Sequence, residues 1–290
     1  MNDKPQVTLN EKQISSNVLE LKSYSKINLG LWIKEKTPDG YHEIETIYFE
    51  NDNLYDDIEI QFKESKSLSV NVSFKQEELN NLILPENNLA YKAALLFLNK
   101  AGITGSCNIN LNKNIPIEAG LGGGSSNAAC VLKGLNQIFN HCSSEAELLI
   151  LGSQIGSDVP FFILGKTCFA RGRGEKLLRI ENKLNLQVKI VKMEKLHIST
   201  KWAYDQIDSR EFIADHRREI DCLVKAMKDC NYDLFFKSIF NDFEMVVFSF
   251  YLELINERKK LLDEGYKAVS LCGSGSSVFG VKEKKNQNDI

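Results

Sequence analysis

Apolar and polar residues alternate along the first quarter of the chain, and such alternation predicts β-strands. It runs through VLELKSYSKINLGLWI (residues 18–33) and returns in HEIETIYFE (42–50), DDIEIQF (56–62) and SLSVNVSF (67–74). Turn residues such as PDG at 38–40 separate these runs, as they do between paired strands. The sequence therefore predicts an antiparallel, β-rich opening.

Helical spacing of apolar residues appears next, in NNLAYKAALLFLNKAG (87–102), which ends on glycine, a common helix stop. A strand pattern returns in CNINLNKNIPI (107–117) and leads directly into a glycine-rich loop. Beyond the loop, Val131, Leu132 and Leu135 fall on one helical face. The glycine-rich loop is therefore predicted to join a strand to a helix N-terminus.

The second half of the chain reads as a mixture of strands and helices. Ser144 with Glu147 forms a capping-box pattern, which predicts a helix that ends near Gly152. The next segment reads as a short turn and two strand-like pieces, IGSDVPFFILG (155–165) and TCFARGRGEKL (167–177). Further expected elements are a strand at 186–193, helix-like stretches at 202–207, 218–230, 233–244 and 251–265, a strand at 267–273 and a solvated tail at 282–290.

Composition places the 290-residue chain among ordinary globular proteins, with 43% hydrophobic and 26% charged residues. A net charge of -3 provides no basic field for nucleic acid or an anionic membrane. No apolar run approaches the roughly 20 residues that cross a bilayer, so a cytoplasmic protein is expected. The expected organisation is a polar extension (1–17), an N-terminal domain (18–183) and a C-terminal domain (184–290).

Seven cysteines occur, an odd number, and no two are spaced as Cys-x-x-Cys. This usage predicts reduced thiols, most of them buried, rather than a disulfide framework or a zinc site.

The glycine-rich loop, IPIEAGLGGGSSNAAC, is the strongest local signal for chemistry. It fails the Walker A pattern, since the only Gly-Lys-Thr, at 165–167, has Pro160 where the first glycine belongs. It also fails the dinucleotide fingerprint, since Ser125 stands at the third glycine position. What remains is a helix N-terminus with free N–H groups and glycines that let phosphate approach, with Ser125 and Ser126 as further donors or Mg²⁺ ligands. The alternative is a flexible turn that allows tight helix packing.

Three segments in order carry a resemblance to the GHMP kinase family. They are SKINLGL (25–31), PIEAGLGGGSSNAA (116–129) and LCGSGSSVFG (271–280). Further signs, DGYHEIETI (39–47), IGSDVPFF (155–162), ARGRGE and NDFE, resemble those members that act on a cytidyl diphosphate-linked polyol in isoprenoid precursor synthesis. The resemblance covers about residues 18–280.

The resemblance implies an α+β, two-domain GHMP kinase fold, with an N-terminal part like ribosomal protein S5 domain 2 and a C-terminal ferredoxin-like α/β sandwich. It implies ATP and Mg²⁺ as cofactors, with the nucleotide bound by the central loop. No acidic metal ligand can be placed from the sequence. The implied ATP-binding residues are Pro116, Ile117, Glu118, Ala119, Gly120, Leu121, Gly122, Gly123, Gly124, Ser125 and Ser126.

Lys26 and Asp158 occupy the catalytic positions that the resemblance implies. Phosphoryl transfer to an alcohol requires positioning, neutralisation of charge and a group that accepts the hydroxyl proton. Asp158 would be that base, and Lys26 would stabilise the phosphoryl group or the nascent alkoxide. From the residues alone, Asp158 also reads as a turn-capping aspartate and Lys26 as an edge-strand lysine facing water.

Substrate recognition is assigned through the resemblance to Asn28, Tyr41, His42 and Tyr204. It implies a cytosine ring held between aromatic side chains, here Tyr41 and Tyr204, with its edge read by His42. Trp202 is a near rival for Tyr204. Without the resemblance, Tyr41 reads as packing and His42 as a surface histidine.

Some residues depart from the family pattern. Tyr24 and Ser25 stand where Pro and Ala are common, and only ten residues follow Gly280, where a further helix and strand are usual. Two alternatives remain open at this point: another small-molecule kinase of the family, of homoserine or mevalonate type, and a non-catalytic nucleotide-binding protein. The presence of both Lys26 and Asp158 argues against the second alternative.

Overall fold

The computed structural model describes residues 18–193, 196–209 and 217–284, and it divides into two compact units. Each unit is assembled from separate stretches of sequence. The first holds the described residues up to Ser25 together with Leu54–Ile117 and Gly122–Leu164, and the second holds Lys26–Asn53, Glu118–Leu121 and the described residues from Gly165 onward. The expected domains, 18–183 and 184–290, remain a prediction, and the expected extension, 1–17, lies outside the described residues.

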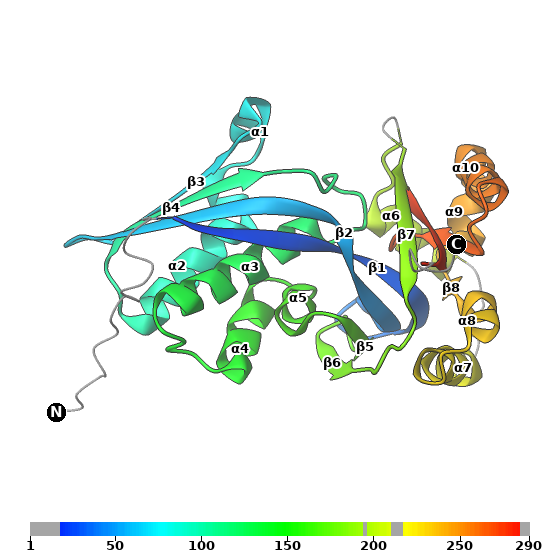
Figure 1. Ribbon diagram of the computed structural model, residues 1–290. Helices are drawn as coiled ribbons and strands as arrows, with labels where there is room; N and C mark the ends of the chain where they lie inside the picture. The colour runs from blue at the N-terminus through cyan, green and yellow to red at the C-terminus, as the bar shows by residue number, and fades with distance from the viewer. Residues whose placement is uncertain (1–17, 194–195, 210–216, 285–290) are drawn as a thin grey trace. The chain divides into compact units, whose positions relative to one another are not determined.

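Two long strands, β1 (Leu19–Lys36) and β2 (His42–Glu64), contribute to both units. In the first unit, β2 pairs antiparallel with β4 (Gly105–Asn112), and β4 pairs parallel with β3 (Ser69–Phe74). The resulting strand order is β3-β4-β2-β1 (Figure 1). The predicted strands at 42–50 and 56–62 are thus one continuous strand.

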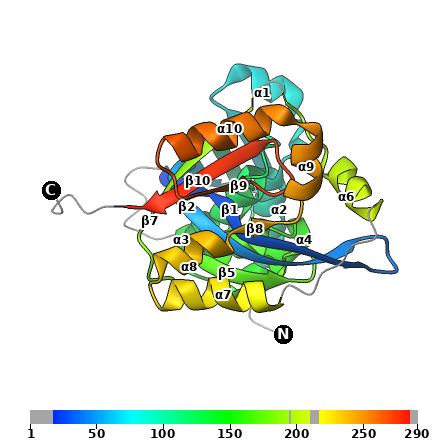
Figure 2. The ribbon, with the colours of Figure 1, turned by 90° about the vertical axis from the view of Figure 1, so that its right-hand side faces the viewer.

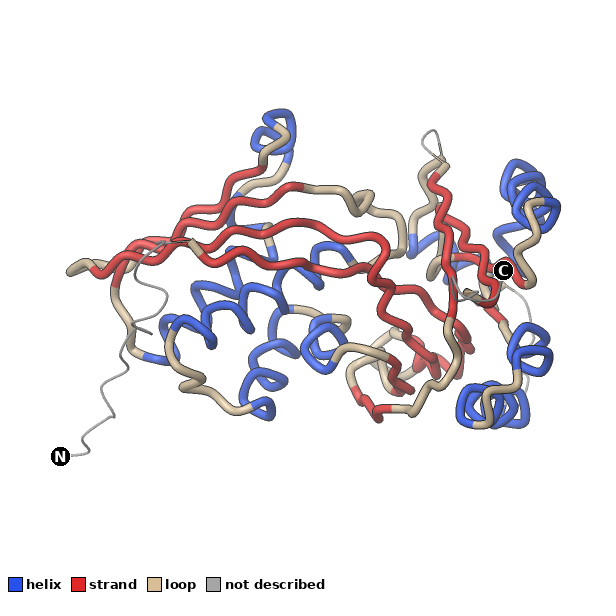
Figure 3. The backbone as a smooth tube through the Cα atoms, in the orientation of Figure 1, coloured by secondary structure: helices blue, strands red, loops and turns tan. Residues whose placement is uncertain are grey.

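Helices at residues 89–101, 123–138, 145–155 and 159–164 of the first unit lie along one face of this sheet, as the blue helices below the long red strands of Figure 3 show. A Cβ on Gly134 of α3 (Gly123–Ile138) would meet Leu21 of β1 at 2.6 Å and Ile60 of β2 at 2.7 Å. Glycine therefore lets α3 lie directly against the sheet. The other helices of this unit are α1 (Glu77–Leu82), the short 3₁₀ helix η2 (Pro85–Asn87), α2 (Leu89–Ala101), α4 (Glu145–Ile155) and α5 (Val159–Leu164).

Helix ends follow the signals in the sequence. The capping box at the start of α4 is confirmed, because the Ser144 hydroxyl accepts from the Glu147 N–H and Glu147 accepts from the Ser144 N–H. α4 ends at Ile155, three residues beyond the predicted stop at Gly152. α2 ends as predicted at Gly102, whose φ of 68° is the left-handed conformation of a glycine C-cap.

Strands of the second unit form two groups. In the first, β2 pairs antiparallel with β5 (Thr167–Arg171), β5 pairs with β6 (Lys176–Arg179), and β1 pairs parallel with β8 (Phe240–Asn241). The second is a three-stranded antiparallel sheet in the order β7 (Leu186–Lys192), β10 (Ser277–Glu283) and β9 (Ala268–Leu271). Two sheets combined with helices confirm the α+β class.

Helices of the second unit are α6 (Thr200–Asp208), α7 (Arg217–Lys228), α8 (Tyr232–Ser238), α9 (Glu244–Phe250) and α10 (Leu252–Asp263). Figure 2 shows α9 and α10 together beside the β7-β10-β9 sheet, and α7 beside α8. Val247 of α9, Leu261 of α10 and Leu271 of β9 belong to one buried cluster that also includes Leu31 of β1. This cluster joins the small sheet, its helices and β1 within the unit.

Two predictions of secondary structure are wrong. The strand-like piece PFFIL is part of α5, a short helix whose Val159, Phe161 and Phe162 are all buried. An apolar run that is buried on every side has no period, so it does not distinguish a strand from a helix. The helix expected at 233–244 is broken into α8, β8 and the start of α9. β10 extends to Glu283, and both Glu283 and Lys284 of the expected solvated tail are exposed.

All seven cysteines are free, as predicted. Four of them, Cys107, Cys130, Cys168 and Cys272, are buried, whereas Cys142 and Cys230 are exposed. Among the described residues, no helix has both the length and the apolar character of a membrane span.

Candidate active site

The start of α3 presents free backbone N–H groups beside the glycines of the loop. The N-cap is Gly122, with φ 70°, so no side chain caps the helix, and the first turn carries no acidic residue. The first N–H groups of a helix lack intrahelical acceptors and carry partial positive charge. An uncapped helix start of this kind suits a phosphate group.

The two serines of the loop differ in exposure. Ser126 is 2% exposed, and its hydroxyl lies 2.6 Å from the Ser23 hydroxyl. Ser125 is half-buried. The structure therefore makes Ser125 the more accessible hydroxyl at this helix start.

Buried loop side chains include those of Ala119 and Leu121, each 1% exposed. Because side chains this buried cannot reach a ligand, only the backbone at these two positions is left for a nucleotide. The Glu118 side chain is exposed, and its φ of 55° is a left-handed conformation that few residues other than glycine adopt.

Lys26 lies where the three predicted motifs meet within the second unit. Its backbone N–H donates to the carbonyl of Leu121 (3.0 Å), and its Nζ donates to Asn28 Oδ1 (2.9 Å). Its Nζ is also 3.9 Å from the point where a Cβ on Gly273 would lie. Burial raises the pKa of the neighbouring Cys272 thiol to about 12, although the Lys26 ammonium acts to lower that pKa. Lys26 is 6% exposed, which contradicts the alternative of an edge lysine facing water.

Asn28 is 1% exposed and lies beside Lys26. Its Nδ2 donates to the Thr46 hydroxyl (2.7 Å), which in turn donates to the Gly30 carbonyl (2.6 Å). Asn28 therefore links the ammonium of Lys26 to the β2 strand. Its predicted contact with substrate remains a prediction.

Gly120 lies against residues 272–276, the glycine-containing loop between β9 and β10 (hereafter the C-terminal glycine loop). A Cβ at Gly120 would lie 2.0 Å from the carbonyl oxygen of Cys272, and the φ of 75° at Gly120 favours glycine. No side chain fits at this position without displacing backbone. The close approach explains one glycine of the cluster by packing, independently of any ligand.

Gly120→Ala is expected to destabilise the protein by more than about 3 kcal/mol, because overpacking against backbone adds to the strain of a left-handed alanine. The matched control is Gly102→Ala, which has a similar φ of 68° but nothing within 4 Å of the added Cβ. That control should cost only about 1 kcal/mol. Urea unfolding measures both changes, and equal losses would contradict the close approach.

His42 and Tyr204 are brought together as stacked rings, with centroids 5.1 Å apart and planes 11° apart. Both nitrogens of His42 face acceptors: Nδ1 lies 2.9 Å from the Lys34 carbonyl, and Nε2 lies 2.7 Å from Asp208 Oδ1. A hydrogen bond from Lys36, followed by the charge of His42, lowers the pKa of the Asp208 carboxyl.

Tyr204 and its rival Trp202 have different neighbours. Trp202 packs edge-on against Phe250 (5.2 Å) and Tyr251 (5.4 Å). Tyr204 instead stacks on His42, the histidine predicted to read the base. The choice of Tyr204 over Trp202 as a substrate-binding ring remains a prediction.

Tyr41 remains accessible, with 58% of its surface exposed. The guanidinium of Arg173 lies 3.8 Å from the centre of its ring, a cation–π contact. Arg173 also pairs with Asp39 in the same turn region. An exposed aromatic ring can stack on a planar ligand.

Asp158 directly precedes the first residue of α5 and is half-buried. This position fits the predicted base as well as the alternative of a capping aspartate. Asp158 belongs to the first unit and Lys26 to the second, and their predicted proximity remains a prediction. Among the described residues, no cluster of three or more His, Cys, Asp or Glu side chains could hold a metal ion.

Asn241, in the NDFE segment, has no role in the predictions from sequence. It is 2% exposed, and its Nδ2 donates to the carbonyls of Leu271 (3.2 Å) and Gly273 (2.9 Å). Asn241 therefore holds the C-terminal glycine loop beside Lys26. The neighbouring Asp242 accepts from the backbone N–H of Ile33 (2.7 Å), which ties the same segment to β1.

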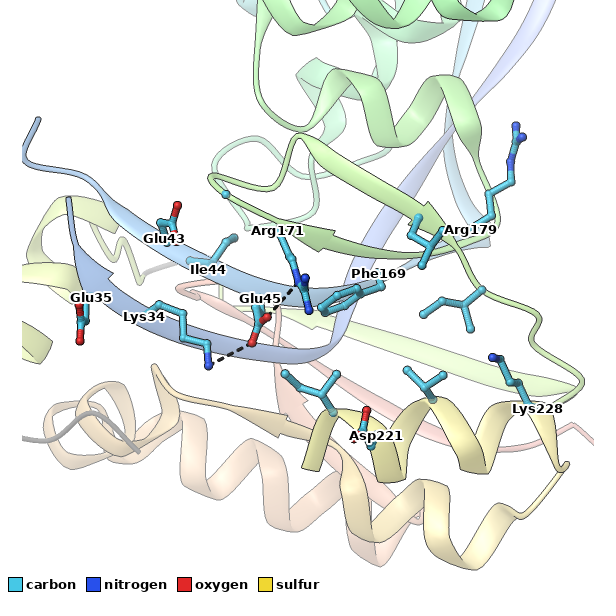
Figure 4. Close-up of a pocket in the computed structure, with 15 residues that line it drawn as sticks. Lys34, Glu35, Glu43, Ile44, Glu45, Phe169, Arg171, Arg179, Asp221 and Lys228 are labelled. Carbon is cyan, nitrogen blue, oxygen red and sulfur yellow. Dashed lines mark ion pairs between the residues drawn. The ribbon is translucent and has the colours of Figure 1, made fainter. Parts of the chain in front are cut away.

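A separate cavity of about 990 Å³ lies in the second unit among β1, β2, β5, β6 and α7 (Figure 4). Glu45 pairs there with Lys34 (3.0 Å) and Arg171 (3.1 Å), and Asp221 of α7 lies on the opposite wall. None of the predicted site residues is among the described residues that line it. The cavity therefore gives no support to the predicted chemistry.

Comparison with protein families adds an independent result. Residues 88–166 match the model of the GHMP kinases N terminal domain. This region includes the glycine-rich loop, α3 and Asp158.

Curated relatives align over almost the whole chain. The chain is 36% identical over 264 residues to a 4-diphosphocytidyl-2-C-methyl-D-erythritol kinase of Caldicellulosiruptor bescii, covering 91% of this chain and 89% of the relative. It is 38% identical over 275 residues to the enzyme of that name from Chlorobium limicola, covering 93% and 91%.

Solved structures agree with these relatives. A crystal structure of 4-(cytidine 5'-diphospho)-2C-methyl-D-erythritol kinase superposes with a TM-score of 0.74 at 31% identity, covering 91% of this chain and 90% of that one. Homoserine kinase from Cytophaga hutchinsonii has the same TM-score at 16% identity, covering 93% and 86%. The second likeness concerns the fold alone, and together the matches confirm the predicted GHMP kinase fold.

Proposed function

Because the chain belongs to the GHMP kinases and, within them, to the 4-diphosphocytidyl-2-C-methyl-D-erythritol kinase family, we propose that it phosphorylates the 2-hydroxyl of that cytidyl polyol with ATP. The reaction belongs to the non-mevalonate route to isoprenoid precursors. The observation that carries the proposal is the setting of Lys26, a buried residue. Its backbone N–H donates to Leu121 of the glycine-rich loop, and its ammonium lies beside Gly273 of the C-terminal glycine loop.

Phosphoryl transfer follows from the roles of two side chains. The oxygen of the substrate hydroxyl attacks the γ-phosphorus of ATP while Asp158 accepts the proton of that hydroxyl. The bond between the γ-phosphorus and the oxygen of the leaving ADP breaks in the same step. The Lys26 ammonium stabilises the negative charge that develops between the two substrates. The N–H groups at the start of α3 bind the nucleotide phosphates. No covalent intermediate with the protein is needed.

Mg²⁺ would bind at this site together with the nucleotide. The site offers the accessible hydroxyl of Ser125 but no cluster of carboxylates among the described residues. Ser125 would hold the ion together with oxygens of the nucleotide, as is usual for Mg²⁺ in kinases. When bound, Mg²⁺ neutralises charge on the β- and γ-phosphates.

Base recognition falls to the aromatic residues near the β1–β2 turn. We propose that Tyr41 and Tyr204 hold the cytosine ring and that His42 lies at its edge, with Asp208 and the Lys34 carbonyl fixing the His42 ring. The exposed ring of Tyr41 supplies a face on which a base stacks. Hydrogen bonds supply the identity of the base.

Tyr41→Ala is expected to raise the KM for the cytidyl substrate by about 5- to 150-fold, the cost of one lost stacking contact of about 1–3 kcal/mol. The KM for ATP should stay within about twofold of the parent value, since Tyr41 lies outside the ATP loop. Steady-state kinetics with each substrate varied in turn measures both constants.

Trp202→Ala is the control for the aromatic assignment. It removes the packing against Phe250 and Tyr251, so it should lower the thermal midpoint without raising the KM for the cytidyl substrate. An unchanged KM in Tyr41→Ala, or a raised KM in Trp202→Ala alone, would count against the proposed base site. The expected cytoplasmic location and the expected lack of nucleic-acid binding remain predictions, and the sequence predicts no oligomeric state.

A further inference from the structure

Asp56 of β2 has a fully buried carboxylate, with 0% exposure, beside the residues that enter the glycine-rich loop. Its Oδ1 accepts from the backbone N–H groups of Asn114 and Ile115, both at 2.8 Å. Its Oδ2 accepts from Asn127 Nδ2 (2.9 Å) and from the ammonium of Lys113. Four donors fill the acceptor capacity of a carboxylate. All of these residues belong to the first unit.

Ser23 of β1 also makes hydrogen-bond contacts with the start of α3. The Ser23 hydroxyl accepts from Asn127 Nδ2 (2.9 Å) and lies 2.6 Å from the Ser126 hydroxyl. Lys113 Nζ donates to Asn127 Oδ1 (2.9 Å), which closes the network. Residues 113–115 enter the loop and residues 126–127 leave it in the first turns of α3. Both ends of the loop are therefore fastened to the two long strands.

The two charged groups of the network, Asp56 and Lys113, form a buried ion pair with each other. The Lys113 side chain is 8% exposed, and burial lowers its pKa, while the neighbouring Asp56 acts to raise it. A buried ion pair is weak support for stability, because its desolvation offsets much of the attraction. Satisfied polar networks in a protein interior instead specify one arrangement of the groups that they join. Here those groups are the two ends of the loop.

We propose that Asp56 is a positioning residue for nucleotide binding: it fixes the two ends of the glycine-rich loop so that the N–H groups at the start of α3 converge on the phosphates. The inference deepens the proposed kinase function and rests on it for the identity of the ligand. Asp56 acts through Lys113, Asn127 and the loop backbone.

Asp56→Asn keeps the size of the side chain but replaces one acceptor oxygen by an amide donor, which faces other donors in either orientation of the amide. The expected result is at least tenfold weaker binding of ADP, measured by calorimetry without the second substrate. The KM for ATP should rise by a similar factor, while the KM for the cytidyl substrate stays within twofold of the parent value. ADP binding within twofold of the parent in a folded Asp56→Asn variant would overturn the proposal.

A matched pair on α3 keeps the test decisive if Asp56→Asn does not fold. Asn127 and Asn136 are both buried and both make two-ended hydrogen bonds, those of Asn136 going to the backbone of Ser143 at 2.9 Å. We expect Asn127→Ala to weaken ADP binding at least fivefold, and Asn136→Ala to leave it within twofold of the parent despite a comparable loss of thermal midpoint. Equal ADP affinities in the two variants would overturn the proposal.

Failure of the proposed function has a different signature. A parent protein that binds ADP but phosphorylates no cytidyl polyol would contradict the substrate assignment alone. The comparison of Asn127→Ala with Asn136→Ala would still decide the role of the Asp56 network, because its readout is nucleotide binding.

Discussion

Asp158→Asn is expected to lower kcat by a factor of about 10² to 10⁴, the range that a positioned general base contributes. The amide keeps the shape of the side chain but cannot take the hydroxyl proton of the substrate. The KM for either substrate should change little, because the proton moves only as the reaction proceeds. A coupled assay that follows ADP release measures the change.

Asp233→Asn is the control for this substitution. Asp233 lies in the first turn of another short helix, α8, and is exposed, so its replacement should leave kcat unchanged. An Asp158→Asn variant with full activity would exclude Asp158 as the base. Equal and negligible rates in the parent and in Asp158→Asn would instead favour a nucleotide-binding protein without catalysis.

Lys26→Met is expected to lower kcat/KM by about 10²- to 10³-fold, because one preorganised group that stabilises transition-state charge is lost. The substitution removes a cation that is only 6% exposed and leaves Asn28 Oδ1 without the donor it has in the structure. The same kinetic assay, together with a thermal melt to confirm folding, measures the result.

Lys22→Met is the matched control for Lys26, because Lys22 lies on the same strand four residues earlier and is exposed. Its ammonium contacts the ring of Tyr55 at 4.2 Å. This replacement should leave kcat/KM within about twofold of the parent, since exposed single contacts contribute little. Equal losses in Lys22→Met and Lys26→Met would mean that the proposed role of Lys26 is wrong.

Local signals in the sequence predicted much of the secondary structure. The capping box of Ser144 and Glu147 and the glycine stop at Gly102 are local devices, and both operate as predicted. The sequence failed where tertiary burial removes the pattern. The apolar run of α5 has no period because its helix is enclosed on all sides, and the segment after α8 changes to a strand where it pairs with β1.

The candidate site likewise contains residues that could be found from the sequence and residues that could not. Gly122, Ser125 and their neighbours could be found because they stand next to one another in the sequence. Asn241 and Asp56 could not, since their partners lie 30 or more residues away. In DDIEIQF, Asp56 is in phase with the buried Ile58 and Ile60, so the alternation places it on the buried face. The sequence does not show the four donors that converge on its carboxylate there.

The choice of substrate is the claim on which the account depends most, and a panel of phosphoryl acceptors tests it most directly. The purified protein is given ATP and Mg²⁺ with 4-diphosphocytidyl-2-C-methyl-D-erythritol, the same polyol without its cytidyl group, homoserine or mevalonate. ADP release is followed for each. Phosphorylation of the cytidyl compound alone is expected, with the product carrying phosphate on the 2-hydroxyl. Equal or faster turnover of the uncapped polyol, homoserine or mevalonate would contradict the substrate assignment.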